Sequence, residues 1–139
     1  MKIQYNNKVL YKSQPRQTVF HNDPAPYRLY GGAAGGGKTE ALIWEAFQIS
    51  QTYTDMHGAV IRKTYPDLLQ SFIRRSLAAY PPELIKFNKQ EKLMYFLETG
   101  STVDYIYIQY EDDVFKYQGP EWDWLMIDEL TQHTEFVFK

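Results

Sequence analysis

Apolar and polar positions along the chain follow the periods of strands and helices in turn. Short apolar runs of strand length occupy residues 27–30, 58–62 and 122–127. Residues 39–49 are apolar on most sides and contain no helix breaker, which predicts a helix packed against a sheet. The order of strand, glycine-rich loop, helix and strand therefore predicts an α/β fold with a mainly parallel sheet flanked by helices.

A second helix and a pair of strands are predicted in the middle of the chain. The helix begins near Thr64, where a proline and an acid occupy the first turn, and the two prolines at residues 81–82 end it. Its apolar stripe consists of Leu68, Leu69, Phe72, Ile73 and Leu77. Residues 93–97 and 102–108 predict a β-hairpin inserted between helical units. The polar segment up to residue 26 predicts an irregular lead-in with room for one short helix.

The composition is that of one soluble globular domain. The chain has 139 residues, a formal net charge of −2 and 44% hydrophobic residues, which suit a single core. It contains no cysteine, which excludes disulfides and thiol chemistry, and its three histidines show no metal-ligand spacing, so we predict no role for them. No stretch approaches the roughly 18 to 20 apolar residues of a membrane span. We therefore expect an intracellular protein without a membrane partner, in which any contact with DNA is local.

Residues 32–39 fit the P-loop pattern G-x-x-x-x-G-K-[ST], between a predicted strand and a predicted helix. Backbone N–H groups of such a loop bind phosphate oxygens at a helix N-terminus. Lys38 is expected to reach the β and γ phosphates of ATP, and Thr39 to ligate Mg²⁺. The alternative is a flexible glycine turn. The predicted ATP contacts are Gly32, Ala33, Ala34, Gly35, Gly36, Gly37, Lys38, Thr39 and Glu40.

Residues 124–129 form a predicted Walker B strand, in which four apolar residues precede two acids. Asp128 is expected to hold the Mg²⁺ shell, and Glu129 to orient the attacking water as a general base. Taken alone, the run also fits an ordinary strand that leaves the core. The upstream P-loop strengthens the prediction because the carboxyl ends of neighbouring strands can converge on one phosphate site.

Supporting roles are predicted for a few further side chains. Gln17, or alternatively Gln14, is a candidate contact to the edge of adenine because an amide both donates and accepts hydrogen bonds. A solvated glutamine is the other interpretation. Hydrolysis also benefits from a cation near the γ-phosphate, for which Arg62, Arg74 and Arg75 are available. Each of these arginines also fits a solvated or salt-bridged position.

In combination these residues resemble the large terminase subunits of tailed phages. Beyond the two nucleotide motifs, the likeness covers residues 15–17, 29–32, 61–68, 71–76, 88–90, 117–123 and 128–131, in family order. The resemblance implies that residues 1–139 are the N-terminal part of an ASCE-type, RecA-like P-loop ATPase domain. It also implies that the domain is incomplete at its C-terminus and lacks the nuclease domain that follows in the family.

The function that the resemblance implies is an ATPase that powers the packaging of double-stranded phage DNA. Its partners would be the portal protein, the small terminase subunit and further copies of itself in a ring, and it would act in the host cytoplasm at the procapsid portal. Many family members carry an arginine ahead of the P-loop glycines, where this chain has Ala34. An arginine finger from that loop is therefore not expected. The charge would come from a partner subunit or from another arginine of this chain, for which Arg62 and Arg75 are the choices.

Two alternatives to a terminase motor remain open from the sequence. The chain is a nucleotide-binding fragment without turnover if the sheet needed for hydrolysis is incomplete. It is another P-loop ATPase, such as a helicase, if helicase motifs follow further along the reading frame.

Overall fold

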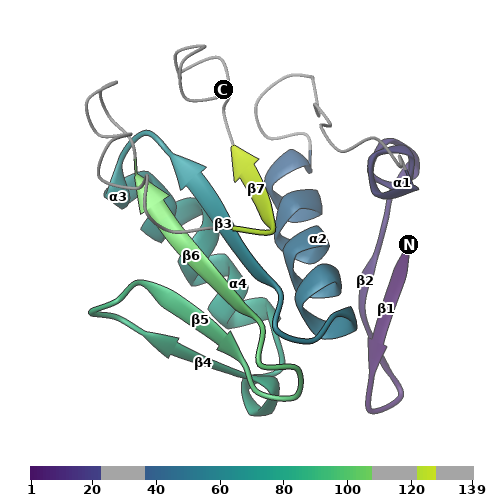
Figure 1. Cartoon of the computed structure of the whole chain (residues 1–139). Coiled ribbons are helices and arrows are strands. Elements are labelled where there is room, and N and C mark those ends of the chain that lie inside the picture. The colour runs from purple at the N-terminus through teal and green to yellow at the C-terminus, as the bar shows by residue number, and fades with distance from the viewer. Residues whose placement is uncertain (23–36, 108–121, 128–139) are drawn as a thin grey trace.

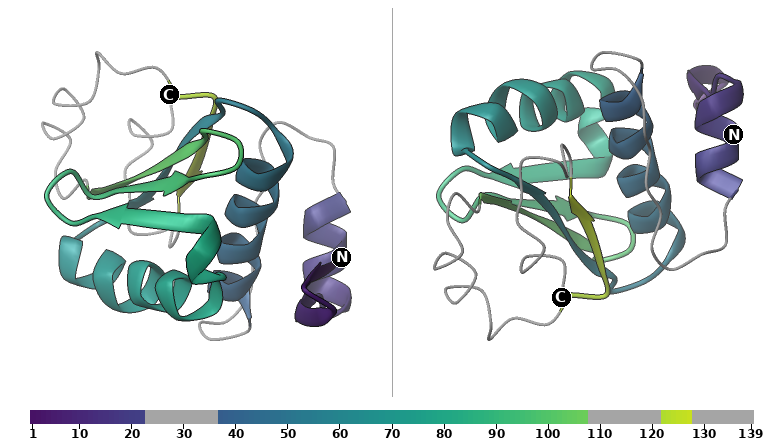
Figure 2. Two further views of the ribbon diagram at one scale, coloured as in Figure 1. Left: turned by 90° about the horizontal axis from the view of Figure 1, so that it is seen from below. Right: turned by 90° about the horizontal axis from the view of Figure 1, so that it is seen from above.

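The computed structural model describes residues 1–22, 37–107 and 122–127, which form an α/β fold (Figure 1). A five-stranded sheet is packed on one face by helix α2 (Lys38–Thr52) and by a second helical segment, and the N-terminal residues pack on the outer side of α2 (Figures 1 and 2). The described helices therefore cover one face of the sheet, whereas the sequence predicts a sheet flanked by helices.

The sheet is mixed, so the prediction of a mainly parallel sheet is wrong. β3 pairs in parallel with β6 and β7, whereas β5 pairs antiparallel with β4 and β6. The spatial order of the strands is β4 (Ile85–Asn88), β5 (Leu93–Phe96), β6 (Thr102–Tyr107), β3 (His57–Arg62) and β7 (Trp124–Ile127).

The predicted β-hairpin is present as β5 and β6, but it is built into the sheet. Val60 of β3 lies opposite Tyr105 of β6, so β6 joins the hairpin to the parallel strands. On its other side β5 pairs with β4, which the sequence pattern does not predict. Because β4 has only four residues and follows two prolines, its alternation is too short to be recognised.

The second helical segment is continuous but not uniformly α-helical. It consists of α3 (Tyr65–Leu68), a π-helical turn η1 (Leu69–Ile73) and α4 (Arg74–Ala79). The predicted start is confirmed, because the Oγ1 atom of Thr64 accepts a hydrogen bond from the N–H of Asp67 at 3.3 Å. The segment ends before a short 3₁₀ turn, η2 (Pro82–Leu84).

The buried stripe of this segment differs from the predicted one at its end. Leu68 and Phe72 are buried as expected, but Leu77 is 40% exposed. Ser76 takes the inward position instead, because it lies four residues after Phe72 and four before the buried Tyr80. The prediction is based on which residues are apolar, whereas burial in the structure follows the helical spacing, so Ser76 is buried and Leu77 is not.

The N-terminal segment is more ordered than predicted. β1 (Lys2–Tyr5) and β2 (Lys8–Lys12) form an antiparallel hairpin, and α1 (Pro15–Asn22) is the expected short helix. Asn6 and Asn7 both have positive φ, at 52° and 63°, which is the backbone conformation of a two-residue hairpin turn and one that asparagine tolerates. The irregular lead-in is therefore a wrong prediction for residues 2–12.

Aromatic side chains fill the core between the sheet, α2 and the N-terminal hairpin. The hydroxyl of Tyr80 donates a hydrogen bond to the backbone carbonyl of Ile43. Burial raises the pKa of Tyr80 and of Tyr105 well above the ordinary value of 10.0. Both phenols are therefore neutral at physiological pH, which lets them pack inside the core without a buried charge.

Candidate functional site at the carboxyl edge of the sheet

Of the predicted P-loop, residues 32–39, the structure describes Gly37, Lys38 and Thr39, where the chain enters α2. Gly37 has a φ of +78°, the left-handed conformation that glycine adopts without strain, and it caps α2. Its carbonyl accepts the N–H of Ala41 at 3.0 Å. Lys38 and Thr39 follow in the first helical turn and are half-buried, while Glu40 is exposed. The other predicted phosphate contacts, residues 32–36, lie outside the described residues.

The predicted Walker B strand is present as β7, and it ends at the edge of the sheet where α2 begins. Figure 1 shows the N-terminal end of α2 and the carboxyl ends of β3, β6 and β7 on the same side of the fold. Lys38 and Ile127 therefore lie at one edge. Asp128 and Glu129 follow Ile127 and lie outside the described residues, so their convergence with Lys38 stays a prediction.

The position of β7 is fixed by contacts at its amino end. Asp123 donates its N–H to the carbonyl of His57 at 2.6 Å, and its Oδ2 atom accepts the N–H of His57 at 2.8 Å. The indole Nε1 of Trp122 donates to Oδ2 of Asp104 at 2.8 Å. Leu125 remains 51% exposed. Hydrogen bonds to β3 and β6 thus fix the amino end of β7 in the sheet.

Gly58 gives β7 room to lie against β3. It pairs with Trp124, and a Cβ added to Gly58 would lie 1.8 Å from the Cε2 atom of the indole. We expect Gly58→Ala to lower the free energy of unfolding by about 1–3 kcal/mol, since overpacking moves the ring and the strand that carries it. Urea unfolding followed by tryptophan fluorescence measures the loss.

A double-mutant cycle separates this clash from other causes. In a Trp124→Ala background the cost of Gly58→Ala should disappear, because a strand alanine is otherwise slightly favoured over glycine. An equal cost in both backgrounds would show that the indole is not the reason for the glycine.

Gln17 does not present its side chain to solvent. It is 2% exposed, its Oε1 atom accepts the N–H of Gln14 at 2.7 Å, and its Nε2 atom donates to the carbonyl of Gly37 at 2.9 Å. Gln14 is exposed. The adenine contact stays a prediction, and the amide of Gln17 connects α1 with the last residue of the P-loop before Lys38.

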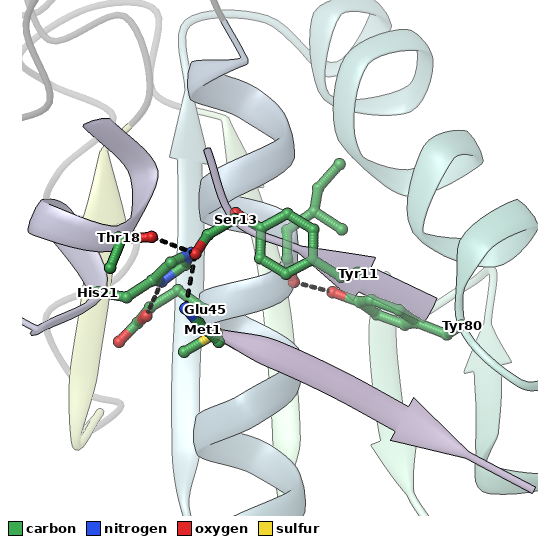
Figure 3. A network of polar contacts seen from close by, with 8 residues as sticks. Met1, Tyr11, Ser13, Thr18, His21, Glu45 and Tyr80 are labelled. Atoms are coloured by element: carbon green, nitrogen blue, oxygen red, sulfur yellow. Dashed lines mark hydrogen bonds and ion pairs between the residues drawn. The ribbon is translucent and has the colours of Figure 1, made fainter. Parts of the chain in front are cut away.

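A polar network that the sequence does not predict joins α1 to α2 (Figure 3). The Nδ1 atom of His21 is paired with the carboxylate of Glu45, and the Nε2 atom lies 3.0 Å from the hydroxyl of Tyr11. The side chain of His21 is fully buried, so the prediction that it has no role is incomplete. Its partner lies 24 residues away, and sequence spacing gives no signal for such a pairing.

The three arginines occupy different surroundings. Arg62 is the last residue of β3, and it is buried at the carboxyl edge of the sheet. Arg74 and Arg75 are exposed on α4, and Nη1 of Arg74 donates to Oε1 of Gln70 at 3.1 Å. Of the two predicted arginine fingers, the structure brings Arg62 to the edge where Lys38 lies, and the role itself stays a prediction.

The described ranges contain neither a grouped set of metal ligands nor a membrane-spanning helix. There, no three His, Asp or Glu side chains are grouped in a way that would hold a metal ion. Thr39 lies in the first turn of α2, and the second predicted Mg²⁺ ligand, Asp128, lies outside those ranges. Within 1–22, 37–107 and 122–127, no helix has the length and apolar character needed to cross a bilayer.

Comparison with protein-family models, with curated proteins and with solved structures finds no match. The α/β class and the mixed sheet thus come from the structure alone. Family membership, cofactors and partners rest on the sequence motifs and on the resemblance described above, and they are proposals.

Proposed function

We propose that this chain is the ATP-binding and ATP-hydrolysing motor domain of a phage terminase large subunit, with a P-loop NTPase fold. The observation that supports the proposal is that α2 begins, and β7 ends, at the same edge of the sheet. The P-loop, residues 32–39, leads into the N-terminus of α2, and the predicted Walker B strand β7 ends at the same edge (Figure 1). Two motifs that are distant in sequence are thus available to one bound nucleotide.

The N-terminus of α2 suits the phosphates of ATP. The first turn of a helix presents unpaired N–H groups and a partial positive charge to an anion. The left-handed Gly37 directs the chain into this turn, and Lys38 adds a full positive charge to it. Phosphate binding is therefore assigned to the P-loop backbone and the ammonium group of Lys38.

The predicted Mg²⁺ ligands have the right chemistry for that ion. A hydroxyl from Thr39 and a carboxylate from Asp128 are hard oxygen donors, which Mg²⁺ prefers together with water and phosphate oxygens. When bound, Mg²⁺ neutralises charge on the β and γ phosphates. Thr39 and Asp128 would supply two of these oxygen donors.

Glu129 is proposed to act on the attacking water. Its carboxylate accepts a proton from water as the water oxygen bonds to the γ-phosphorus, and the bond from that phosphorus to the bridging oxygen breaks to release ADP. A positive charge near the γ-phosphate assists this step, and Arg62 is the better placed of the two predicted arginines. Arg75, exposed on α4, is the alternative.

The biological role follows from the family resemblance. The proposed motor moves double-stranded phage DNA into a procapsid, in contact with the portal protein and the small terminase subunit, as a ring of copies in the host cytoplasm. Residues 61–68, one of the segments that carry the resemblance, comprise the end of β3, the connection to α3, and α3 itself, whose N-cap is Thr64. This connection begins at the edge where the nucleotide is proposed to bind, which suits a coupling of hydrolysis to movement.

Calorimetric titration with Mg·ATP tests the proposal. Wild-type protein should bind, and Lys38→Ala should lower the affinity about tenfold to a hundredfold, because a hydrogen bond to a charged group contributes about 1.5–3 kcal/mol. Lys86→Ala is the matched control, since Lys86 is exposed on β4 at the opposite side of the sheet from β7. Equal affinity in all three proteins would contradict the proposed phosphate site.

A further inference from the structure

We infer that Gln17 is a positioning residue of the P-loop, which holds the Gly37–Lys38 peptide from α1, rather than a contact to adenine. The inference rests on the proposed nucleotide-binding function and deepens it. It assigns the buried amide to the triphosphate end of the ligand, so the affinity it controls should not depend on the base.

The hydrogen bonds of Gln17 use both ends of its amide. Nε2 donates to the carbonyl of Gly37, and Oε1 accepts the N–H of Gln14 at the start of α1. Contact with Gly37 is close, since a Cβ added there would lie 2.7 Å from Nε2. The amide of Gln17 therefore fixes the carbonyl of Gly37. The left-handed φ of Gly37 and its short distance from Nε2 of Gln17 leave no room for a side chain at this position.

Holding this carbonyl also orients the next N–H group. A peptide unit is planar and trans, so the carbonyl of Gly37 and the N–H of Lys38 point in opposite directions. The same carbonyl accepts the N–H of Ala41 and therefore points along α2. The N–H of Lys38 then faces the N-terminal end of the helix, where a phosphate oxygen would bind.

The helix that carries Gln17 is itself anchored. His21 lies four residues after Gln17, on the same face of α1, and pairs with Glu45 of α2. At the start of α1, Ser13 is hydrogen-bonded to Thr18 and to the N-terminal amino group of Met1 (Figure 3). α1 is thus attached to α2 at two points, through Gly37 and through Glu45, and it forms a firm support for the P-loop.

Glutamine is the side chain that this arrangement requires. Glutamate has the same length and retains the acceptor for Gln14, but its carboxylate offers no N–H to the carbonyl of Gly37. Methionine has a similar length and neither function. Gln17→Glu and Gln17→Met therefore remove the support by two different routes while leaving the volume of the site nearly unchanged.

The test compares a nucleotide with a phosphate chain that has no base. Calorimetric titrations use Mg·ATP, Mg·GTP and Mg·tripolyphosphate with wild-type protein and both variants. We expect each variant to weaken all three ligands by a similar factor of about tenfold, the effect of one lost hydrogen bond to the carbonyl of Gly37. Gln48→Glu, the same chemical change at an exposed position of α2, should change none of them.

The outcomes distinguish the inference from the function on which it rests. If the variants weaken Mg·ATP but bind Mg·tripolyphosphate like the wild type, Gln17 reads the base and the inference is overturned. Unchanged affinity for every ligand overturns it as well. If wild-type protein binds none of the three ligands, the proposed function itself fails.

A measurement without ligand covers the case in which a variant folds poorly. Amide hydrogen exchange of Ala41, whose N–H is bonded to the carbonyl of Gly37, should be faster in Gln17→Met than in wild type, while exchange in the last turn of α2 stays the same. Equal exchange at Ala41 in both proteins, or faster exchange along the whole of α2, would show that Gln17 does not act on the P-loop.

Discussion

Replacing Glu129 with glutamine is expected to lower the steady-state rate of ATP hydrolysis by about 10²–10⁴-fold, the usual contribution of a positioned general base. The glutamine side chain keeps the shape of the glutamate and can still hold the water, but it does not accept a proton at neutral pH. Affinity for Mg·ATP should remain within about threefold of the wild type, because the phosphate contacts are assigned to the P-loop and Lys38.

The control for this variant is Glu98→Gln, the same change at an exposed glutamate in the turn between β5 and β6. It should hydrolyse ATP at the rate of the parent. A Glu129→Gln protein as fast as the parent would show that the general base is another residue. Wild-type protein that binds Mg·ATP but does not turn it over would support the alternative of nucleotide binding without hydrolysis.

The parts of the fold that the sequence predicts correctly are those with a strong local signal. α2 is buried on most sides, and the four inner residues of β3, 58–61, and the four residues of β7 are uninterrupted apolar runs. The start of α3 combines a capping threonine with a proline in the first turn. In each case the residues that determine the element are neighbours in the chain, so a window of ten residues contains the information.

The parts that the sequence does not predict depend on distant partners. β1 and β2 bury one side chain each, Ile3 and Tyr11, so their alternation is weak until they pack against α2. The asparagine pair at residues 6–7 is the one local turn signal between these two strands. β6 belongs to a hairpin by local sequence, and only its pairing with β3 makes the sheet mixed.

The same distinction applies to the candidate site. The glycines and Lys38 are recognised from a contiguous motif, because all the proposed phosphate contacts lie in one short stretch of the sequence. The positions of Gln17 and His21 depend on partners 20 and 24 residues away. Its residue type predicts that the amide of Gln17 contacts adenine. In the structure this amide donates a hydrogen bond to the carbonyl of Gly37, the residue before Lys38.

Aromatic contacts of Trp44 connect the N-terminal segment, residues 1–22, to the core of the domain. Trp44 lies on α2 next to Glu45, and its ring stacks on Tyr11 of β2 with centroids 5.5 Å apart. The hydroxyl of Tyr11 lies 3.0 Å from His21 of α1. The indole therefore packs against the N-terminal segment that carries Gln17. Loss of this packing should loosen α1 and weaken the hydrogen bond from Gln17 to Gly37.

Trp44→Ala is expected to lower the free energy of unfolding by about 3–5 kcal/mol, the usual cost of removing a large buried aromatic side chain. The ring is 3% exposed, and it also meets Phe47 and Tyr80 with centroid separations of 5.3 and 5.4 Å. A domain of this size is stable by about 5–15 kcal/mol, so the variant should be close to unfolding. Chemical denaturation measures the change.

Two further variants show whether the loss comes from this packing. Trp44→Phe keeps an apolar ring and should cost clearly less than alanine. Val19→Ala, at a position 72% exposed on α1, should stay within about 0.5 kcal/mol of the wild type. If Trp44→Ala costs less than about 1 kcal/mol, the N-terminal hairpin does not pack on α2 as described. In Trp44→Phe, faster amide exchange at Ala41, whose N–H is bonded to the carbonyl of Gly37, would show that the packing of the hairpin supports the P-loop through α1.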